Sequence, residues 1–262
     1  MKHQMWKVPM AAALVLAGCS DTTNPPLGSG QQMSLSFATL GAAPPAAAAF
    51  GAPAAVMAGD TLVVASGSDT LRITSVELVL SAIKLNRVST SVPCDSTAAE
   101  DACEEFSVGP QLVSMPLGYG VATAIDVPID SGSYDKVEFI IHKPGGDSLD
   151  TAFKAQHPDF ANISIRVRGT FNGTAFTYTT PVDQEQEFTF NPPLVVDASG
   201  SSANLTIRMD VSTWFRVGGT ATGALIDPAS ANVGGQNEGA VRENIKNSIE
   251  AYEDDDRDGD EH

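Results

Sequence analysis

The most chemically specific residues of this 262-residue chain are aspartates near its C-terminal end. Asp254, Asp256 and Asp258 alternate along the chain and are followed by Gly259, which matches the first half of the D-x-D-x-D-G pattern of a calcium loop. Calcium takes about six to eight oxygen ligands, and glycine at the sixth position of such a loop permits a sharp turn. The sequence therefore predicts a calcium site with Asp254, Asp256, Asp258 and Asp260 as ligands.

We expect this calcium site to be weak, because the glutamate that binds through both oxygens at position twelve would lie beyond His262. An amphipathic helix expected over 240–253 would lead into the loop, as the first helix of an EF-hand does. The alternative is a solvated acidic tail that aids solubility, as most runs of charge do.

A serine in the middle of the chain raises the question of hydrolysis. Gly146-Asp147-Ser148-Leu149 resembles the block that carries the nucleophile of the GDSL esterases, which implies that Ser148 would need an imidazole as its base. In those enzymes the block lies near the start of a parallel α/β domain, and an Asp-x-x-His pair lies near the end. Here the block is mid-chain and Gly259 stands three residues before His262. The alternative is a turn after a strand.

Two histidines lie within the expected folded body, His142 and His157. Neither has another His or Cys at the spacing of metal ligands, so we expect each at the surface or at a strand end.

The first residues of the chain have the order of an export signal. Lys2 and Lys7 precede an apolar run over 8–18 that is too short to span a bilayer. The run ends in Leu16-Ala17-Gly18-Cys19, which resembles the lipobox of bacterial lipoproteins. The alternative is an ordinary secretory signal that contains a cysteine.

The lipobox resemblance implies cleavage after Gly18 and lipid attachment at Cys19, through which the membrane becomes a partner of the protein. Ser20, where an aspartate would retain the protein at the inner membrane, implies attachment to the outer membrane. The remaining cysteines, Cys94 and Cys103, enclose a short polar loop, and an oxidising compartment favours a disulfide between them. The rival, a metal site with two thiolates, has no further Cys or His nearby.

Composition excludes some partners. The formal net charge is −17 and the pI is about 4.4, which argues against nucleic acid and against electrostatic binding to anionic lipid. Hydrophobic residues make up 42% of the chain, enough for a real core.

The elements that must position these residues are mostly strands. Asn172-Gly173 between two polar–apolar alternations predicts a tight type I′ hairpin, and a change of apolar phase near Thr74-Ser75 predicts a bulge or a sheet switch. Many short strands separated by turn residues predict an all-β fold, an antiparallel β-sandwich of Ig-like or transthyretin-like type with one C-terminal amphipathic helix. Strands are expected over 33–40, 61–66, 70–89, 111–116, 123–129, 136–142, 162–168, 170–179, 186–190 and 204–211.

The chain divides into four segments. We expect a signal peptide over 1–18, a lipidated cysteine and polar tether over 19–32, a β-sandwich domain over 33–236 with an Ala/Pro-rich loop over 41–59, and a C-terminal helix with an acidic tail over 237–262.

A family resemblance covers roughly residues 33–143. The segments 73–85 and 129–139, with a Gly-x-Tyr turn in the second, look like bacterial β-sandwich lipoproteins of unknown function. They also resemble, more distantly, periplasmic copper-binding lipoproteins associated with methanobactin operons. Those relatives depend on Trp, His and Met residues that have no match here, since Trp214 stands without a nearby His. The resemblance implies fold and location.

These observations predict a non-enzymatic envelope or cell-surface lipoprotein that acts as a binding or scaffolding module for an unidentified protein or small molecule, with weak calcium binding at its tail. The alternatives are a secreted hydrolase that uses Ser148 and a periplasmic metal carrier.

Overall fold

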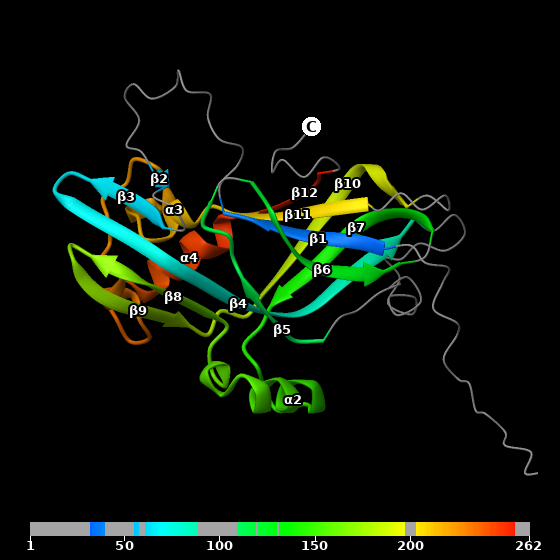
Figure 1. Cartoon of the computed structure of the whole chain (residues 1–262), viewed down its shortest axis with the longest axis horizontal. Helices are drawn as coiled ribbons and strands as arrows, with labels where there is room; N and C mark the ends of the chain where they lie inside the picture. Colours follow the sequence, from blue (N-terminus) through cyan, green and yellow to red (C-terminus); the bar gives the residue numbers. More distant parts are fainter. Residues whose placement is uncertain are drawn as a thin grey trace, which may run out of the picture.

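The structure is a computed structural model that describes residues 32–39, 55–57, 61–88, 109–118, 120–129, 131–196 and 203–254. In these ranges the chain forms two β-sheets that pack face to face, with short helices around them (Figure 1). The all-β sandwich predicted from the sequence is confirmed, and its Ig-like or transthyretin-like type stays a prediction.

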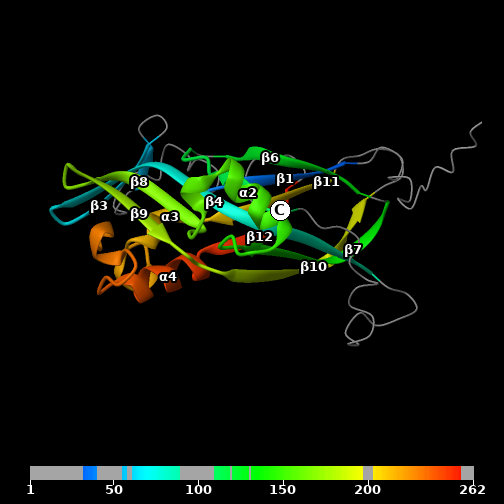
Figure 2. The ribbon, with the colours of Figure 1, turned by 90° about the horizontal axis from the view of Figure 1, so that it is seen from below.

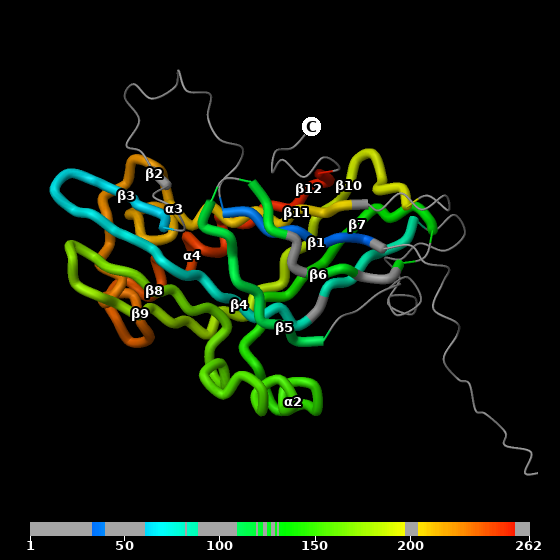
Figure 3. Tube along the Cα trace, viewed as in Figure 1, coloured from blue at the N-terminus to red at the C-terminus, as the bar shows by residue number. Residues whose placement is uncertain are grey.

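The smaller sheet has four strands in the order β12-β11-β1-β6. Its neighbours β1–β6 and β11–β12 run antiparallel, whereas β1 and β11 run parallel and lie side by side although they are far apart in the sequence (Figure 3). The prediction of a purely antiparallel sandwich is therefore wrong for this one pair, because strands joined by a long intervening chain need no hairpin and can pair in either direction. The bounds are β1 Gln32–Ala38, β6 Ala122–Pro128, β11 Ala203–Met209 and β12 Ile249–Glu253.

The larger sheet has eight strands, all paired antiparallel. Its main path runs β10-β7-β4-β3-β2, while β5 and β8 also pair with β4, and β9 pairs with β8. Within the range 41–59, expected to be loop, residues 55–57 form β2. The bounds are β2 Ala55–Met57, β3 Leu62–Ser66, β4 Asp69–Arg87, β5 Gln111–Ser114, β7 Gly132–Ile141, β8 Ile165–Phe171, β9 Thr174–Thr180 and β10 Gln184–Val196.

The apolar residues of these alternating strands meet between the sheets in one core. Met33, Leu35 and Phe37 of β1 lie in it without exposed surface, together with Leu78 of β4 and Phe139 of β7. Figure 2 shows the layer of β6, β1 and β11 on one side of this core and β7 and β10 on the other. Full burial of each such side chain stabilises the fold by about 1.5–3 kcal/mol.

Strand β4 changes the face that it buries near its middle. Leu71 and Ile73 are buried, and so are Val76 and Leu78, which could not share a face in a regular strand. The pairing of β4 with β8 shifts register between Ile73 and Ser75. The bulge predicted from the change of apolar phase is confirmed.

The turn between β8 and β9 also follows the sequence. Asn172 has φ 50° and Gly173 has φ 83°, the left-handed conformation that a type I′ turn requires at both central residues. The Asn172 side chain accepts a hydrogen bond from the backbone N–H of Thr70 at 2.8 Å and so holds the hairpin beside the start of β4.

The C-terminal helix is shorter than predicted. Helix α4 spans Glu238–Asn247, and the chain then continues as strand β12. Val241 and Ile245 are buried from the helix, but Ile249 and Tyr252 belong to the strand, where their three-residue spacing only imitates a helical period. The strand forms because the edge of β11 offers backbone partners that a continued helix would leave unpaired.

A buried arginine connects the segment before α4 to strand β3 through hydrogen bonds. Arg216, only 2% exposed, donates hydrogen bonds to the carbonyls of Ser212, Gly223 and Ala65, the last of which is in β3. Burial lowers the pKa of the Arg216 guanidinium, and the charge of Asp210 opposes that effect.

The remaining helical elements are short, and none in the described ranges is long and apolar enough to cross a membrane. Their bounds are α2 Ser148–Gln156, η1 Pro158–Phe160, α3 Val211–Trp214, η2 Val217–Gly219 and η3 Pro228–Ala231.

The bulge makes one glycine indispensable. A Cβ added to Gly169, which pairs with Ile73, would lie 1.8 Å from the carbonyl oxygen of Arg72. We expect Gly169→Ala to lower the free energy of unfolding by about 1–3 kcal/mol, since the backbone must move to admit the methyl group. Urea denaturation measures this loss.

Gly239→Ala in α4 is the matched control, because a Cβ there meets nothing within 4 Å. We expect the free energy of unfolding of this control to equal that of the wild type or to be up to about 1 kcal/mol higher, because alanine favours a helix more than glycine does. If Gly169→Ala is as stable as the wild type, the close approach of β8 to the β4 backbone at the bulge is not required for stability.

Candidate binding groove

Helix α2 lies outside the sandwich, on an excursion between β7 and β8 (Figure 1). A second, small core holds the helix to the outer face of the large sheet. In it Phe153 of α2 and Phe160 of η1 are buried with Val79 of β4, and Leu112 and Ile163 pack against them. These apolar contacts hold the helix beside strand β5.

The block Gly146-Asp147-Ser148-Leu149 is the start of this helix. The Asp147 carboxylate caps α2 by accepting a hydrogen bond from the backbone N–H of Asp150 at 2.7 Å, and Ser148 is the first helical residue. Within the described ranges Ser148 has no hydrogen bond to His142 or to His157. The His157 ring packs on Phe153 with centroids 4.7 Å apart.

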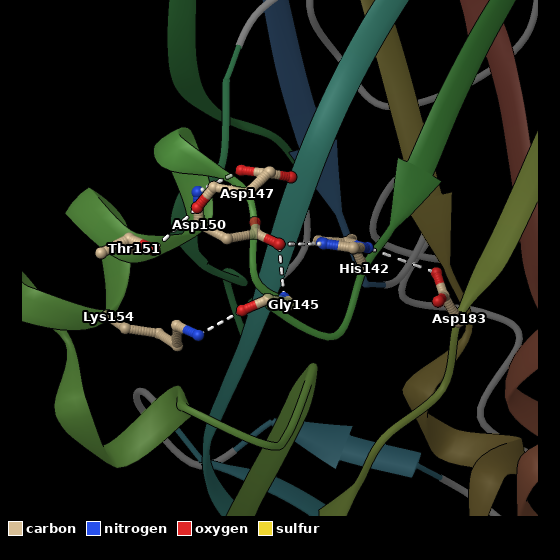
Figure 4. Close-up of polar contacts among 7 residues, drawn as sticks. All are labelled: His142, Gly145, Asp147, Asp150, Thr151, Lys154 and Asp183. Carbon is tan, nitrogen blue, oxygen red and sulfur yellow. Dashed lines mark hydrogen bonds and ion pairs between the residues drawn. The ribbon is translucent and has the colours of Figure 1, made fainter.

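A buried carboxylate fixes the start of the helix to the end of β7 (Figure 4). Asp150 is 1% exposed, and its Oδ2 accepts hydrogen bonds from His142 Nε2 at 3.0 Å and from the backbone N–H of Gly145. Burial, the largest influence, raises the pKa of Asp150, but these hydrogen bonds and the charges of His142 and Lys154 outweigh burial and lower that pKa. Lys154 closes the loop by donating to the carbonyl of Gly145.

His142 joins three elements through its two ring nitrogens. Nε2 meets Asp150 of α2, and Nδ1 lies 3.4 Å from Asp183 Oδ1 in the connection from β9 to β10 (Figure 4). The imidazole donates to both carboxylates only when it carries both protons. The position of α2 relative to the sheet is therefore set by polar contacts as well as by the small core.

The first of two hollows, which we call the α2 hollow, lies between α2 and β5 and has a volume of about 470 Å³. Leu149 stands at it with 61% of its surface exposed, next to Gly109. Among the described residues its lining contains no Asp, Glu, Lys or Arg and consists of Gly109, Pro110, Gln111, Leu112, Ser114, Leu149, Ala152, Phe153, Gln156 and His157.

The second hollow, the bulge hollow, has a volume of about 370 Å³ and lies where the bulge of β4 faces the residues after β5. Ser114 lines both hollows, so they adjoin at β5, and we call the two together the β5 groove. The bulge hollow is lined by Thr74, Ser75, Val76, Glu77, Ser114, Met115, Pro116, Leu117 and Arg168.

An ion cluster stands at the polar end of the groove. Arg166 donates hydrogen bonds to both carboxylate oxygens of Glu77, from Nε to Oε2 at 2.8 Å and from Nη2 to Oε1 at 2.9 Å. Its guanidinium also lies over the Phe160 ring. The hydrogen bond from Arg166 is the largest influence on Glu77 and, with the charges of Arg166 and Arg168, it lowers the pKa of Glu77 against the effect of burial. Arg168 adds one contact to Glu77 Oε2 at 2.8 Å and remains 43% exposed. This end of the groove thus presents the Arg168 guanidinium beside the Glu77 carboxylate.

The acidic tail begins inside the fold. Asp254 is fully buried: Thr206 Oγ1 donates to its carboxylate at 2.8 Å, and Asn204 Nδ2 donates to its carbonyl at 2.8 Å. The expectation that a helix leads into a calcium loop at Asp254 is therefore wrong, because β12 leads there and Thr206 binds this carboxylate. Calcium binding itself stays a prediction.

The other predicted site residues lie outside the described residues, so their predictions stand untested: Cys19, Cys94, Cys103, Asp256, Asp258 and Asp260. Among the residues that the structure does describe, no group of three or more His, Cys, Asp or Glu side chains could hold a metal ion.

Sequence reasoning missed the β5 groove and its supports. A signal for α2 was present, since Asp147 followed by Asp150 is an N-cap with an acid in the first turn. The juxtaposition of Leu149 with β5 and of Arg168 with the bulge had no local signal.

Comparison of the chain with protein-family models, with curated proteins and with solved structures finds no match.

The Asp150 carboxylate gives a pH-dependent prediction. We expect Asp150→Asn to lose about 1.5–3 kcal/mol of unfolding free energy near neutral pH, as for hydrogen bonds to charged groups. Because folding lowers the pKa of Asp150, the ionised group stabilises the fold above its unfolded pKa and loses this effect as the pH falls through the lower folded value. The difference between wild type and variant should shrink only below the usual titration range of aspartate. Urea denaturation over that pH range measures it.

Asp147→Asn is the control, since asparagine caps a helix as well as aspartate does. A loss in Asp147→Asn as large as that in Asp150→Asn, or no loss in either variant, would contradict the role assigned to the buried carboxylate.

Proposed function

We propose that the protein is a lipid-anchored, non-catalytic binding module of the bacterial cell envelope, attached to the outer membrane. The anchor rests on Leu16-Ala17-Gly18-Cys19 and on Ser20, which follows it. A lipid chain on the Cys19 sulfur and another on its amino group would together hold the protein stably at the membrane.

The observation that carries the binding function is the β5 groove. Each of its hollows falls within the range of ligand pockets, about 300–1,000 Å³. Among the described residues, apolar and uncharged polar side chains line the α2 hollow, whereas the bulge hollow adds hydroxyl groups and the paired Glu77 and Arg168 to its apolar lining. A site of this composition suits recognition, in which apolar contact supplies affinity and a small number of polar groups fix orientation.

Binding is favoured over hydrolysis by the position of Ser148. This serine opens α2 and is exposed, while Asp150 and Asp183 face the His142 imidazole. A nucleophilic serine needs an imidazole within hydrogen-bond reach.

Two features of the proposal rest on the sequence alone. We propose a disulfide between Cys94 and Cys103, and weak calcium binding by Asp256, Asp258 and Asp260 beyond the buried Asp254.

The anchor is tested by metabolic labelling of bacterial cells with radioactive palmitate. We expect the wild-type protein to carry label and to sediment with the outer membrane, and Cys19→Ala to carry none, because the acylated sulfur is gone. Cys94→Ala is the matched control and should remain labelled. Persistent label in Cys19→Ala would refute the anchor.

A further inference from the structure

We infer that the β5 groove binds an extended peptide segment that carries an apolar side chain and, about four residues away, a carboxylate. This inference rests on the proposed binding function and names its ligand class. It is carried by three features of the groove: an edge of β5 with which no further strand of the described residues pairs, an apolar end, and an end that presents an arginine.

The open edge belongs to β5. This four-residue strand pairs with Glu77–Leu80 of β4, and no other strand among the described residues pairs with it. A strand that is paired on one side presents the N–H and C=O groups of alternate residues on the other side, and an extended peptide can bind there as an added strand. Such pairing depends on the peptide backbone, so the side-chain hollows are left to select the sequence.

The apolar end is the α2 hollow. Leu149 is the large apolar side chain that stands exposed there, and Leu112 and Phe153 lie beneath it in the small core. Docking of an aliphatic or aromatic side chain would cover Leu149. Gln111 and Gln156 add neutral amide groups that suit a peptide backbone and that a plain hydrocarbon chain would leave without partners.

The cationic end is Arg168. Glu77 is held through both oxygens by Arg166, which also pairs with Asp159 at 3.2 Å, so two carboxylates balance two arginines in this cluster. Arg168 is the arginine that lines the bulge hollow, and 43% of its side chain is exposed. One hydrogen bond of Arg168, to Glu77, is found among the described residues, although a guanidinium has five N–H groups. The guanidinium N–H groups that have no partner among the described residues suit a carboxylate, and Thr74 and Ser75 line the same hollow.

The distance between the two ends sets the spacing in the ligand. Leu112 lines the α2 hollow and Pro116 lines the bulge hollow, four residues further on. At a rise of about 3.3 Å per residue this separation is about 13 Å along an extended chain. Residues four apart in a strand also point to the same side, so one peptide can place both side chains in the groove.

The test is selection from a phage-displayed library of random heptapeptides on the purified protein. We expect enrichment of peptides in which an Asp or Glu stands about four residues from a Leu, Ile, Val or Phe. A synthetic peptide of the enriched sequence should bind Arg168→Gln at least tenfold more weakly than wild type, because the charge-assisted contact is lost. Bound peptide should also slow amide hydrogen exchange in β5 at least tenfold, a sign of strand pairing.

Two variants control for folding and for the apolar end. Arg208→Gln removes an arginine that is ion-paired with Glu250 on the smaller sheet, and it should leave affinity unchanged. Ala152→Trp fills the α2 hollow from an exposed helix position and should abolish peptide binding while the thermal unfolding midpoint stays within a few degrees of wild type.

Several results would overturn the inference: no enrichment, equal affinity of wild type and Arg168→Gln, or unchanged exchange in β5. If lauric acid, and no peptide, raises the melting temperature in an Ala152-dependent way, the groove binds a lipid acid and the peptide inference fails while the binding function survives. Absence of palmitate label from the wild-type protein would instead refute the anchor and leave peptide selection unaffected.

Discussion

The backbone pairing of one strand, β4, is the constraint on which the rest of the structure depends. Its nineteen residues hydrogen-bond with four other strands, so the two ends of the large sheet are held in register by a single continuous segment. A strand this long twists, and a fixed side-chain alternation would carry its apolar face away from the core. The extra residue at the bulge restores the inward face, and Gly169 gives the backbone room to do so.

The β5 groove is a consequence of that constraint. The bulge lies between the part of β4 that pairs with β3 and the part that pairs with β5, and the residues after β5 face it across the bulge hollow. Beyond it, Val79 faces outward from β4 and is buried under α2. The helix is fixed by the buried Asp150 as well as by apolar contact, which keeps the α2 hollow beside β5. Apolar packing alone would leave a helix of nine residues free to slide, whereas hydrogen bonds to one carboxylate define a single position.

Polar groups are also buried on the smaller sheet. Ser36, Asn204, Thr206 and Asp254 form a chain of hydrogen bonds that crosses β1, β11 and the end of β12. This network ties the last described strand to the first. Because a buried polar group without a partner is costly, each member depends on the others, and the network specifies the register of the C-terminal strand.

The sequence by itself determined those features that depend on neighbours along the chain. Strand positions followed from alternation, the β8–β9 hairpin from Asn172-Gly173, and the bulge from the change of apolar phase at Thr74-Ser75, because each of these is a matter of local backbone geometry. Only the tertiary structure decided what depends on distant partners. The segment after Asn247 became a strand because β11 offered an edge, and Asp254 was buried because Thr206 faces it. The β5 groove arose where Leu149 and Arg168, from separate elements, came to lie along β5. Such features depend on which strands pair and which faces pack, and the local sequence does not determine that long-range pairing.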